Sequence, residues 1–359
     1  MSRFFALKVA DIQRQTPDAV AVSLEVPPAL RDQFRFSPGQ YLPCRAIIDG
    51  EEIRKSYSIC SIPSDPYLVI AVKEVYNGRF STYVNKQLKP GDVFEVMPPE
   101  GKFTLPENLS KDAVLIFFAA GSGITPVISL IRYFLEQFPN GQAKLFYNNK
   151  TSDSIIFRDR LESLKNAHME RFSIYHLLTR ELSGTELMTG RIDAEKTKAF
   201  ARHFFAVEEI HAAFICGPEH MILNLKEGLK EIGLAEEQIR FELFGTAPVH
   251  EFKDKKPEVI EAGDDRVSKV TLRVDGHETD LQVRYHGEAV LDAALNLGHD
   301  LPYSCKGGVC STCKALVVEG KVHMDIHYGL EADEIDAGYV LTCQSHPRTE
   351  RLILDYDIQ

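Results

Sequence analysis

The cysteine spacing near the C-terminus constrains this chain more than any other feature of its sequence. Three of the seven cysteines, Cys305, Cys310 and Cys313, lie within the stretch "CKGGVCSTC", and Cys343 follows thirty residues later. Cysteines this close together have four common uses: disulfide bonds, a zinc site, thiol–disulfide exchange and an iron–sulfur cluster. The spacing and the rest of the chain favour one of them.

An odd number of cysteines in a long chain without an export signal argues against a disulfide framework. Zinc sites normally use pairs of C-x2–4-C, and only one such pair is present. A thioredoxin-like C-x-x-C is expected beside a βαβ unit, whereas this loop follows an expected hairpin. The cysteines are separated by four residues, then by two, and then by a long gap, which is the ligand spacing of a plant-type [2Fe–2S] cluster. Gly307 and Gly308 let backbone N–H groups approach the sulfurs of such a cluster. The spacing therefore predicts a [2Fe–2S] cluster bound by Cys305, Cys310, Cys313 and Cys343.

The size and charge of the chain exclude several other classes of protein. A length of 359 residues predicts two or three domains. A formal net charge of −11 argues against a nucleic-acid binder and against an anionic membrane surface as a partner. The N-terminus lacks the apolar core of a signal peptide, and the longest strongly apolar stretch, "AVLIFFAAG" from Ala113, is too short to span a bilayer. We therefore expect a cytoplasmic location.

The pattern of apolar residues divides the chain into three expected domains and a linker. Residues 1–108 alternate with period two, as in "DAVAVSLEV" and "YLVIAVKEV", and the turns "SPGQ" and "KPGD" favour an antiparallel β-barrel. Residues 109–245 alternate between apolar strands and amphipathic helices, which predicts an α/β domain with a parallel sheet. Residues 246–266 are charged and carry two prolines, as a linker would. Residues 267–359 begin with a hairpin turning at "DG" and continue into a helix and the cysteine loop.

The α/β segment contains a glycine-rich turn of the kind that binds phosphate groups. "GSGITP", from Gly121 to Pro126, lies between an expected strand and an expected helix, where the helix N-terminus favours an anion. Its spacing differs from the G-x-G-x-x-G of dehydrogenases, because Pro126 stands in place of the last glycine. By itself this turn is a weak sign of a nucleotide site.

Together with "CGPEHM", "FELFG", "KSYSI", "VKEVYNGRFSTYV" and "PEGKF", this turn resembles the ferredoxin–NADP⁺ reductase superfamily, and the C-terminal segment resembles a plant-type ferredoxin, a β-grasp α+β fold. The resemblance implies that Ser58, Thr125, Cys216 and Glu242 take part in catalysis beside the nicotinamide and the flavin. It further implies FAD as the flavin, although relatives with the same domain order include FMN users. The flavin would be bound by Lys55, Tyr57, Ser58, Val72, Lys73, Gly78, Phe80 and Ser81, and the dinucleotide by Gly121, Ser122, Gly123, Thr125, Pro126, Cys216, Gly217, Pro218, Met221 and Phe244.

The flavin motif departs from the family pattern at one position. The family has R-x-Y-S, whereas this chain has Lys55, with Arg54 one place earlier. Neighbours on a strand point to opposite faces, so only one of the two can face the flavin phosphate. A lysine supplies charge there but not a bidentate fork. The sequence leaves open which residue makes the contact.

The second turn of the α/β segment bears on the choice between NADPH and NADH. An NAD site usually places an acid at the end of the second strand, to bind the ribose hydroxyls. Here the turn reads "YNNKTSDSIIFRDR", with Lys150 after the strand and Arg158 nearby. A cation without an immediate acid favours the 2′-phosphate of NADPH. Solvated surface charges remain the alternative for both residues.

These expectations combine into an electron-transfer chain from NADPH through FAD and the [2Fe–2S] cluster to an acceptor outside the chain. Residues 267–359 carry 15 Asp and Glu against 8 Lys and Arg, a net charge of −7 out of −11. We therefore expect the ferredoxin domain to dock electrostatically on a basic face of its partner, although acidity can also simply keep a small domain soluble.

The order of the domains, with "CKGGVCSTCK", "HYGLEADEIDAGYVLTCQ" and "GRID", is similar over nearly the whole chain to the reductase subunits of phenylacetyl-CoA epoxidase, a multicomponent di-iron oxygenase of phenylacetate degradation. That resemblance implies the oxygenase components as partners. Reductases of ketosteroid 9α-hydroxylase and of hybrid-cluster protein share the architecture and stay open as alternatives. A stand-alone NAD(P)H diaphorase and a redox-sensing module also stay open.

Overall fold

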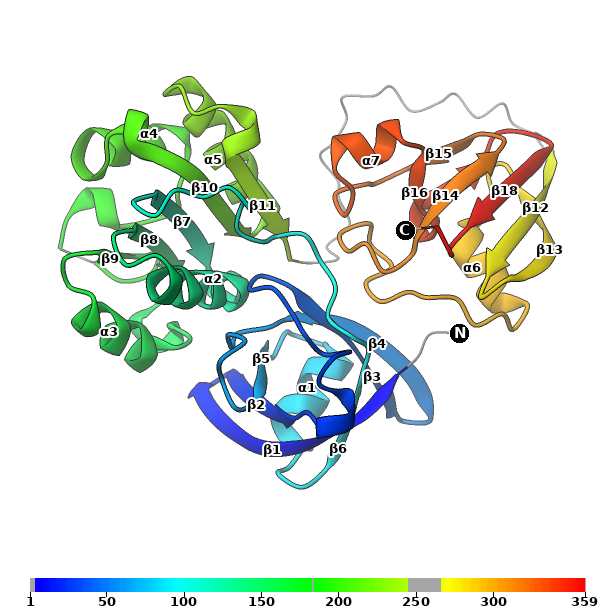
Figure 1. Ribbon diagram of the computed structural model, residues 1–359, viewed down its shortest axis with the longest axis horizontal. Coiled ribbons are helices and arrows are strands. Elements are labelled where there is room, and N and C mark those ends of the chain that lie inside the picture. Colours follow the sequence, from blue (N-terminus) through cyan, green and yellow to red (C-terminus); the bar gives the residue numbers. More distant parts are fainter. Residues whose placement is uncertain (1–3, 183, 245–265, 359) are drawn as a thin grey trace. The chain divides into compact units, whose positions relative to one another are not determined.

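The structure, a computed structural model, describes residues 4–182, 184–244 and 266–358. Phe5–Ile53 and Tyr57–Phe244 form one compact unit, and the C-terminal residues belong to a second. Figure 1 shows two sheets in the first unit, coloured from blue to green, and the C-terminal sheet in yellow to red. The expected linker, 246–266, lies outside the described residues except for Arg266. The domain boundaries drawn from the sequence therefore stay predictions.

The first sheet is antiparallel and has six strands in the order β4-β3-β6-β1-β2-β5. Its strands are β1 (Phe5–Thr16), β2 (Ala19–Glu25), β3 (Tyr41–Ile48), β4 (Glu51–Ser58), β5 (Leu68–Lys73) and β6 (Val93–Val96), and helix α1 (Arg79–Lys86) follows β5. A bridge between Ile59 and Ile70 connects the end of β4 to β5, so the two outer strands meet and the sheet closes into a barrel. The predicted antiparallel barrel is confirmed.

The barrel forms because apolar side chains alternate along its strands and fill one interior. Leu7, Val22, Ile70 and Phe94, for example, come from four different strands and are fully or almost fully buried in one cluster. One inward face per strand is the pattern of a small closed sheet, in which side chains occupy the whole interior. The strands expected in "DAVAVSLEV" and "YLVIAVKEV" are β2 and β5.

The second sheet is parallel, with five strands in the order β11-β10-β7-β8-β9. Its strands are β7 (Val114–Ala120), β8 (Gln142–Asn149), β9 (Phe172–Leu178), β10 (Ile210–Gly217) and β11 (Ile239–Leu243), and its helices are α2 (Ile124–Gln137), α3 (Arg158–Ala167), α4 (Ala194–Phe204) and α5 (Glu219–Glu231). Helices cover both faces of the sheet (Figure 1), so the central strands are apolar on both sides. The predicted α/β architecture is confirmed, and α4 and β11 extend it.

The strand order of this sheet determines where a ligand can bind. From β7 the chain moves outward through β8 to β9, then returns to the other side of β7 through β10 and β11. The connections therefore diverge between β7 and β10 at their carboxyl ends. Ligands of open α/β sheets bind at this kind of switch point.

The third sheet belongs to the C-terminal unit and has five strands in the order β13-β12-β18-β14-β16. Its elements are β12 (Val267–Val274), β13 (His277–Arg284), α6 (Val290–Asn296), β14 (Lys314–Glu319), α7 (Ala332–Asp336), β16 (Tyr339–Leu341) and β18 (Arg351–Asp355), and β15 (Val322–Met324) pairs with β17 (Ser345–Pro347). The predicted hairpin is β12–β13, with Asp275 and Gly276 both at positive φ in its turn. A mixed sheet packed against helix α6 agrees with the predicted α+β class.

No helix among the described residues is both long and apolar enough to cross a membrane.

Candidate functional site

A cavity of about 520 Å³ lies at the carboxyl ends of the parallel strands, at the switch point between β7 and β10. It brings together the glycine-rich turn after β7, the chain after β8 and β9, and the start of α5. Its lining residues are Lys73, Ala120, Gly121, Ser122, Gly123, Asn148, Asn149, Lys150, Thr179, Arg180, Gly190, Arg191, Ile192, Gly217, Pro218, His220, Met221 and Phe244. Nine of these were expected at the dinucleotide or the flavin from the sequence: Lys73, Gly121, Ser122, Gly123, Lys150, Gly217, Pro218, Met221 and Phe244.

The turn from Gly121 to Gly123 is held in a conformation that leaves its backbone facing the cavity. Gly121 has a φ of 53°, and a Cβ on Gly123 would lie 2.1 Å from the carbonyl oxygen of Cys216. The Thr125 hydroxyl donates to the Ser122 carbonyl at 2.9 Å, so the predicted Thr125 lies behind the turn and supports it. Helix α2 starts at Ile124 with no side-chain cap, which leaves the N–H groups of its first turn for an anion. This arrangement fits a dinucleotide pyrophosphate.

Three cationic side chains line the cavity: Lys150, Arg180 and Arg191. Within the described residues none of them has an ion-pair partner in the structure. Asn149, also on the cavity wall, is 4% exposed, and neither its amide nitrogen nor its side-chain oxygen has a hydrogen-bond partner among the described residues. A buried amide without partners costs free energy, so it is expected to meet a polar ligand. These three cations and the unpaired amide fit a phosphorylated nucleoside.

Ser58, Cys216 and Glu242 come together near the carboxyl ends of β10 and β11. Cys216 and Glu242 are register partners on β10 and β11, and Ser58, from the end of β4, donates to a carboxylate oxygen of Glu242 at 3.3 Å. Burial, together with the Glu242 charge, raises the pKa of the Cys216 thiol well above its ordinary value. Cys216 is therefore a neutral packing group rather than a thiolate.

Glu242 has an unusually high affinity for its proton. Burial raises the pKa of its carboxyl group to about 8, and the hydrogen bond from Ser58 partly opposes this shift. Although part of the side chain remains accessible to solvent, the carboxyl group itself is enclosed by neighbouring atoms. Around neutral pH the protonated form of Glu242 therefore predominates, so a proton donor lies next to the hydroxyl of Ser58.

The residues expected to bind the flavin lie on the barrel around the start of α1. The rings of Tyr57 and Phe80 have centroids 5.7 Å apart, and Phe80 is 2% exposed, so Tyr57 rests on a fixed apolar base. Gly78 precedes the helix and has no room for a side chain, because a Cβ there would lie 2.5 Å from the Ser81 hydroxyl oxygen. That hydroxyl donates to the Gly78 carbonyl at 3.0 Å and accepts from the Val75 N–H at 3.2 Å. The glycine and the serine thus shape a tight turn whose following N–H groups remain open to a pyrophosphate.

The other two expected flavin residues differ in how accessible they are. The Val72 carbonyl accepts from the amide of Asn85 at 3.0 Å and Val72 is fully buried, so its side chain packs in the barrel core. Lys73 lines the dinucleotide cavity and pairs with Asp18 at 3.4 Å. The side chain of Lys73 can therefore reach a ligand in the cavity, whereas the side chain of Val72 cannot.

The alternation along β4 bears on the choice between Lys55 and Arg54. Tyr57 packs against the barrel core, and Lys55, two residues earlier, shares its face. Arg54 shares the opposite face with Ser58. The face shared with Tyr57 favours Lys55 for the phosphate contact.

The four predicted cluster ligands gather in the C-terminal unit. Cys310, Cys313 and Cys343 are buried and Cys305 is partly exposed. The Cys305 sulfur lies 3.1 Å from the Cys310 sulfur and accepts from the Gly307 N–H at 3.3 Å. Hydrogen bonds from the Cys310 and Cys343 thiols hold the pKa of Cys305 well below its ordinary value. Thiolate character stabilised by backbone N–H groups is what a metal-binding cysteine loop requires.

Among the described residues, no group of three or more His, Cys, Asp or Glu side chains is arranged around a single point as one metal ion would need. A two-iron cluster has a different requirement, because each iron takes only two of the protein ligands. Gly329 closes the loop from behind, since a Cβ there would lie 2.5 Å from the Cys310 carbonyl oxygen. The donor set and its tight loop fit a [2Fe–2S] cluster.

Three family models match successive parts of the chain. An oxidoreductase FAD-binding domain matches residues 6–105, an oxidoreductase NAD-binding domain matches residues 117–227, and a 2Fe-2S iron-sulfur cluster binding domain matches residues 272–348. The [2Fe–2S] cluster predicted from the cysteine spacing, and the flavin and dinucleotide implied by the resemblance, agree with the families of the three segments.

Similar whole proteins are reductase components of oxygenases. The chain is 39% identical to a subunit of 1,2-phenylacetyl-CoA epoxidase from Escherichia coli K12, over 99% of each chain. The chain belongs to the family of oxygenase reductases that includes this epoxidase subunit. It is also 32% identical to the ferredoxin reductase component of 3-ketosteroid-9-alpha-monooxygenase from Rhodococcus rhodochrous, over 99% of this chain and 97% of the relative.

A solved structure shares the fold of almost the whole chain. Phthalate dioxygenase reductase, described as a modular structure for electron transfer from pyridine nucleotides to [2Fe-2S], covers 98% of both chains with a TM-score of 0.59 and 22% identity. The protein is therefore an NAD(P)H-dependent oxidoreductase that carries FAD and a [2Fe–2S] cluster, as predicted from the sequence.

The structure separates the two cations that the sequence assigned to the 2′-phosphate. Lys150 lines the dinucleotide cavity, whereas Arg158 lines another cavity, of about 560 Å³, and pairs with Glu162 at 3.1 Å. Arg158 is the first residue of α3. Its contact with a 2′-phosphate stays a prediction.

Arg180, Arg191, Asn149 and His220 line the cavity but were not singled out from the sequence. Arg180 comes two residues after the end of β9, so the rule that ligands bind at strand carboxyl ends could have found it. Arg191 lies in the "GRID" stretch, which carries no local sign of a binding role. Its position depends on the long connection from β9 to α4.

Proposed function

We propose that this protein oxidises NADPH and passes the electrons singly to the oxygenase component of a phenylacetyl-CoA epoxidase. The support is three sites in one chain: a dinucleotide cavity and a flavin-binding barrel in one compact unit, and a cysteine loop in the second unit. When bound, FAD supplies the conversion of a two-electron reduction into single-electron steps, and the [2Fe–2S] cluster supplies one-electron transfer. The residues of the chain bind and orient the dinucleotide and the cofactors, and they supply protons.

NADPH, rather than NADH, is favoured by the positive charge of the side chains that line the cavity. The 2′-phosphate carries about two negative charges near neutral pH, and Lys150, Arg180 and Arg191 offer three positive ones. The described residues that line the cavity include no Asp or Glu to bind free ribose hydroxyls. This is the observation that carries the nucleotide preference.

Ser58 and Glu242 can move a proton to or from the edge of the flavin. Glu242 holds a proton at neutral pH, and the Ser58 hydroxyl lies 3.3 Å from its oxygen and belongs to the same motif as Tyr57. Proton movement along these two oxygens balances the charge that arrives with the electrons. Cys216, the register partner of Glu242, is a small neutral group and would leave room for the nicotinamide.

The acceptor is proposed from two observations. The Escherichia coli epoxidase subunit shares 39% of its residues with this chain over almost its whole length, more than the 32% shared with the ketosteroid reductase. The ferredoxin segment carries 15 acids against 8 bases, which suits a docking face of opposite charge on the partner.

The experiment that tests the acceptor is reconstitution. Purified reductase, NADPH and the oxygenase components of phenylacetyl-CoA epoxidase are expected to form epoxide in step with NADPH consumption. The ketosteroid oxygenase, in the same assay, is expected to yield product at least 10-fold more slowly. NADPH consumption without epoxide, at a rate set by a small quinone acceptor, would instead indicate a stand-alone diaphorase and would overturn the proposed acceptor.

A further inference from the structure

The barrel and the parallel sheet share one hydrophobic core, although each has a core of its own. Ala19, Cys60 and Val69 from the barrel segment are buried in the same cluster as Phe117 and Val127 from the α/β segment. Apolar contact of this kind holds two layers together but has no preferred direction. The contacts that can fix how one layer is turned against the other are polar.

Helix α2 makes one buried and one partly buried polar contact across this boundary. The Ser129 hydroxyl donates to the Ser61 carbonyl at 2.6 Å, in a fully buried position. Arg132 donates two parallel hydrogen bonds to Asp65, at 2.6 and 2.8 Å. We call these two contacts, between Ser61 and Ser129 and between Asp65 and Arg132, the α2 clamp.

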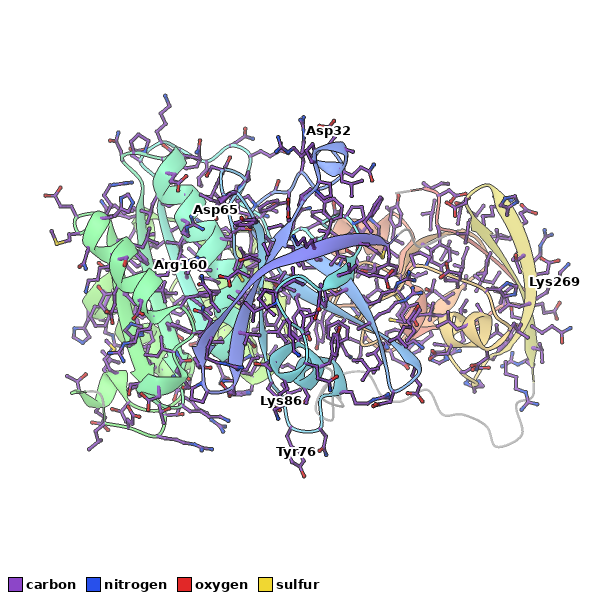
Figure 2. The ribbon with its side chains drawn as sticks, turned by 90° about the horizontal axis from the view of Figure 1, so that it is seen from below. Asp32, Asp65, Tyr76, Lys86, Arg160 and Lys269 are labelled. Atoms are coloured by element: carbon purple, nitrogen blue, oxygen red, sulfur yellow. The ribbon has the colours of Figure 1, made fainter. Side chains whose placement is uncertain are left out.

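Hydrogen bonds within the barrel segment hold Ser61 and Asp65, the barrel residues of the α2 clamp, in place. The Ser61 hydroxyl accepts from the Val69 N–H of β5 at 2.9 Å, and Asp65 accepts from the Ile62 N–H at 3.0 Å. Asp65 also lies close enough to Arg160 of α3 to interact with its charge, and Figure 2 shows both side chains on the same side of the unit. Burial opposes ionisation of Asp65, but the hydrogen bonds from Arg132 and Ile62 outweigh it, so the pKa of Asp65 is lowered and the ion pair is maintained at neutral pH.

The position of the α2 clamp in the chain gives it a direct connection to both ligands. Ser61 follows the flavin motif at Tyr57 and Ser58 by only a few residues, and α2 begins immediately after the dinucleotide turn at Gly123. A change at the clamp therefore moves the two segments that hold the reacting rings. Transfer between bound groups depends steeply on their separation, and an error of about 1 Å can cost about 100-fold in rate.

We propose that the α2 clamp is a positioning device that sets the distance and angle between the flavin-binding strand β4 and the dinucleotide turn. Bidentate ion pairs such as Asp65–Arg132, which is partly buried, are directional and contribute geometric specificity even where their net effect on stability is small. The clamp thus controls the productive arrangement of nicotinamide and flavin without touching either one.

The test compares Asp65→Asn, Arg132→Lys and Ser129→Ala with a matched control, Glu95→Gln. Glu95 forms a similar two-bond pair with Arg45, at 3.1 and 2.8 Å, but that pair joins β3 to β6 within the barrel. The full chain with its cofactors is used throughout. Amide hydrogen exchange follows residues 59–68 and helix α2, and stopped-flow reduction of the flavin uses NADPH with hydrogen or deuterium at the transferred position.

The clamp variants are expected to exchange the amides of residues 61–65 at least 10-fold faster than the unaltered protein. Flavin reduction should slow by about 10-fold or more, in line with a small misplacement, and its isotope effect should become more dependent on temperature. Binding of NADP⁺ and flavin content should stay unchanged, because the residues that touch them are intact. Glu95→Gln should leave exchange in 59–68 and the isotope effect as they were.

Two results together would overturn the inference. The clamp variants would lose as much thermal stability as Glu95→Gln, and their isotope effect, with its temperature dependence, would be the same as in the unaltered protein. If Asp65→Asn does not fold because Arg132 is left unpaired, Ser129→Ala decides, since it removes one hydrogen bond and leaves no buried charge.

Discussion

Arg180 and Arg191 are the residues on which the nucleotide preference depends. Both line the dinucleotide cavity beside Lys150, and a hydrogen bond to a charged group contributes about 1.5–3 kcal/mol. Replacing either arginine by glutamine should therefore lower kcat/KM for NADPH by about 10- to 100-fold and leave kcat/KM for NADH nearly unchanged.

Arg158→Gln is the matched control for this prediction, because Arg158 lines a different cavity. Steady-state kinetics with both nucleotides measure the effect. The prediction would be contradicted if Arg158→Gln lost its preference for NADPH while Arg180→Gln and Arg191→Gln kept theirs. Arg158, as the sequence suggested, would then be the residue that binds the 2′-phosphate.

Glu242 predicts a particular pH dependence. Since burial raises the pKa of its carboxyl group to about 8, the group is neutral below that pH and becomes a carboxylate above it. The carboxylate cannot donate a proton and repels the negative charge that builds up on the flavin, so flavin reduction should slow as the pH rises through about 8. Glu242→Gln stays neutral and should show a flat profile between pH 6 and 9. Stopped-flow measurements over this range check it, and a decline of equal size in both proteins would assign the pH dependence to another group.

At the level of single residues, the sequence predicts site membership well where a motif is short and local. The four cluster cysteines and the turn from Gly121 to Gly123 are determined by spacing and by glycine's freedom of backbone conformation. Arg191 is different, because a long connection brings it to the cavity and no local pattern reports it. Arg158 illustrates the converse. It is close to Lys150 in sequence, but it is the first residue of α3 and lines a different cavity.

The loop that holds the cluster cysteines is the element in which backbone geometry matters most. Gly308 has a φ of 71°, and a Cβ there would lie 2.8 Å from both the side chain and the carbonyl oxygen of Ile326. Gly308→Ala should therefore displace the loop and reduce cluster content by more than half, because strain and crowding act together.

Gly298→Ala controls for strain alone, since Gly298 has a φ of 84° but open space around its Cβ position. Iron content and visible absorbance of the purified variants provide the measurement. Equal cluster content in the two variants would show that crowding at Gly308 is unimportant.

Elements with strong periodicity are predicted best from this sequence. Strand β7 and helices α2 and α5 follow from long apolar runs and helical spacing, and the hairpin β12–β13 follows from its "DG" turn. Strand pairing in the barrel is harder to predict, because it depends on contacts between segments far apart in sequence, such as Cys44 of β3 with Val96 of β6. The polar contacts of α2 with Ser61 and Asp65 have no sequence signature at all, since they arise only when two sheets meet.

For the whole molecule, the uneven charge predicts how the protein meets its acceptor. Residues 267–359 carry a net charge of −7 out of −11. Attraction between exposed charges is screened within about 10 Å at 0.1 M salt and about 3 Å at 1 M. Reduction of the oxygenase should therefore slow by at least 10-fold between 0.05 and 0.5 M sodium chloride, whereas turnover with a neutral quinone should change little. Rapid-mixing rates over this salt range check it, and equal salt dependence with both acceptors would mean that docking does not use the acidic segment.

The most direct test of the account is an anaerobic titration of the purified protein with NADPH, followed by visible absorption and electron paramagnetic resonance. We predict flavin bands near 450 nm with broader iron–sulfur absorption, both bleached by NADPH faster than by NADH, and the signal of a reduced [2Fe–2S] cluster in the same sample. Flavin bands that bleach while no cluster signal develops in iron-loaded protein would contradict the proposed electron path.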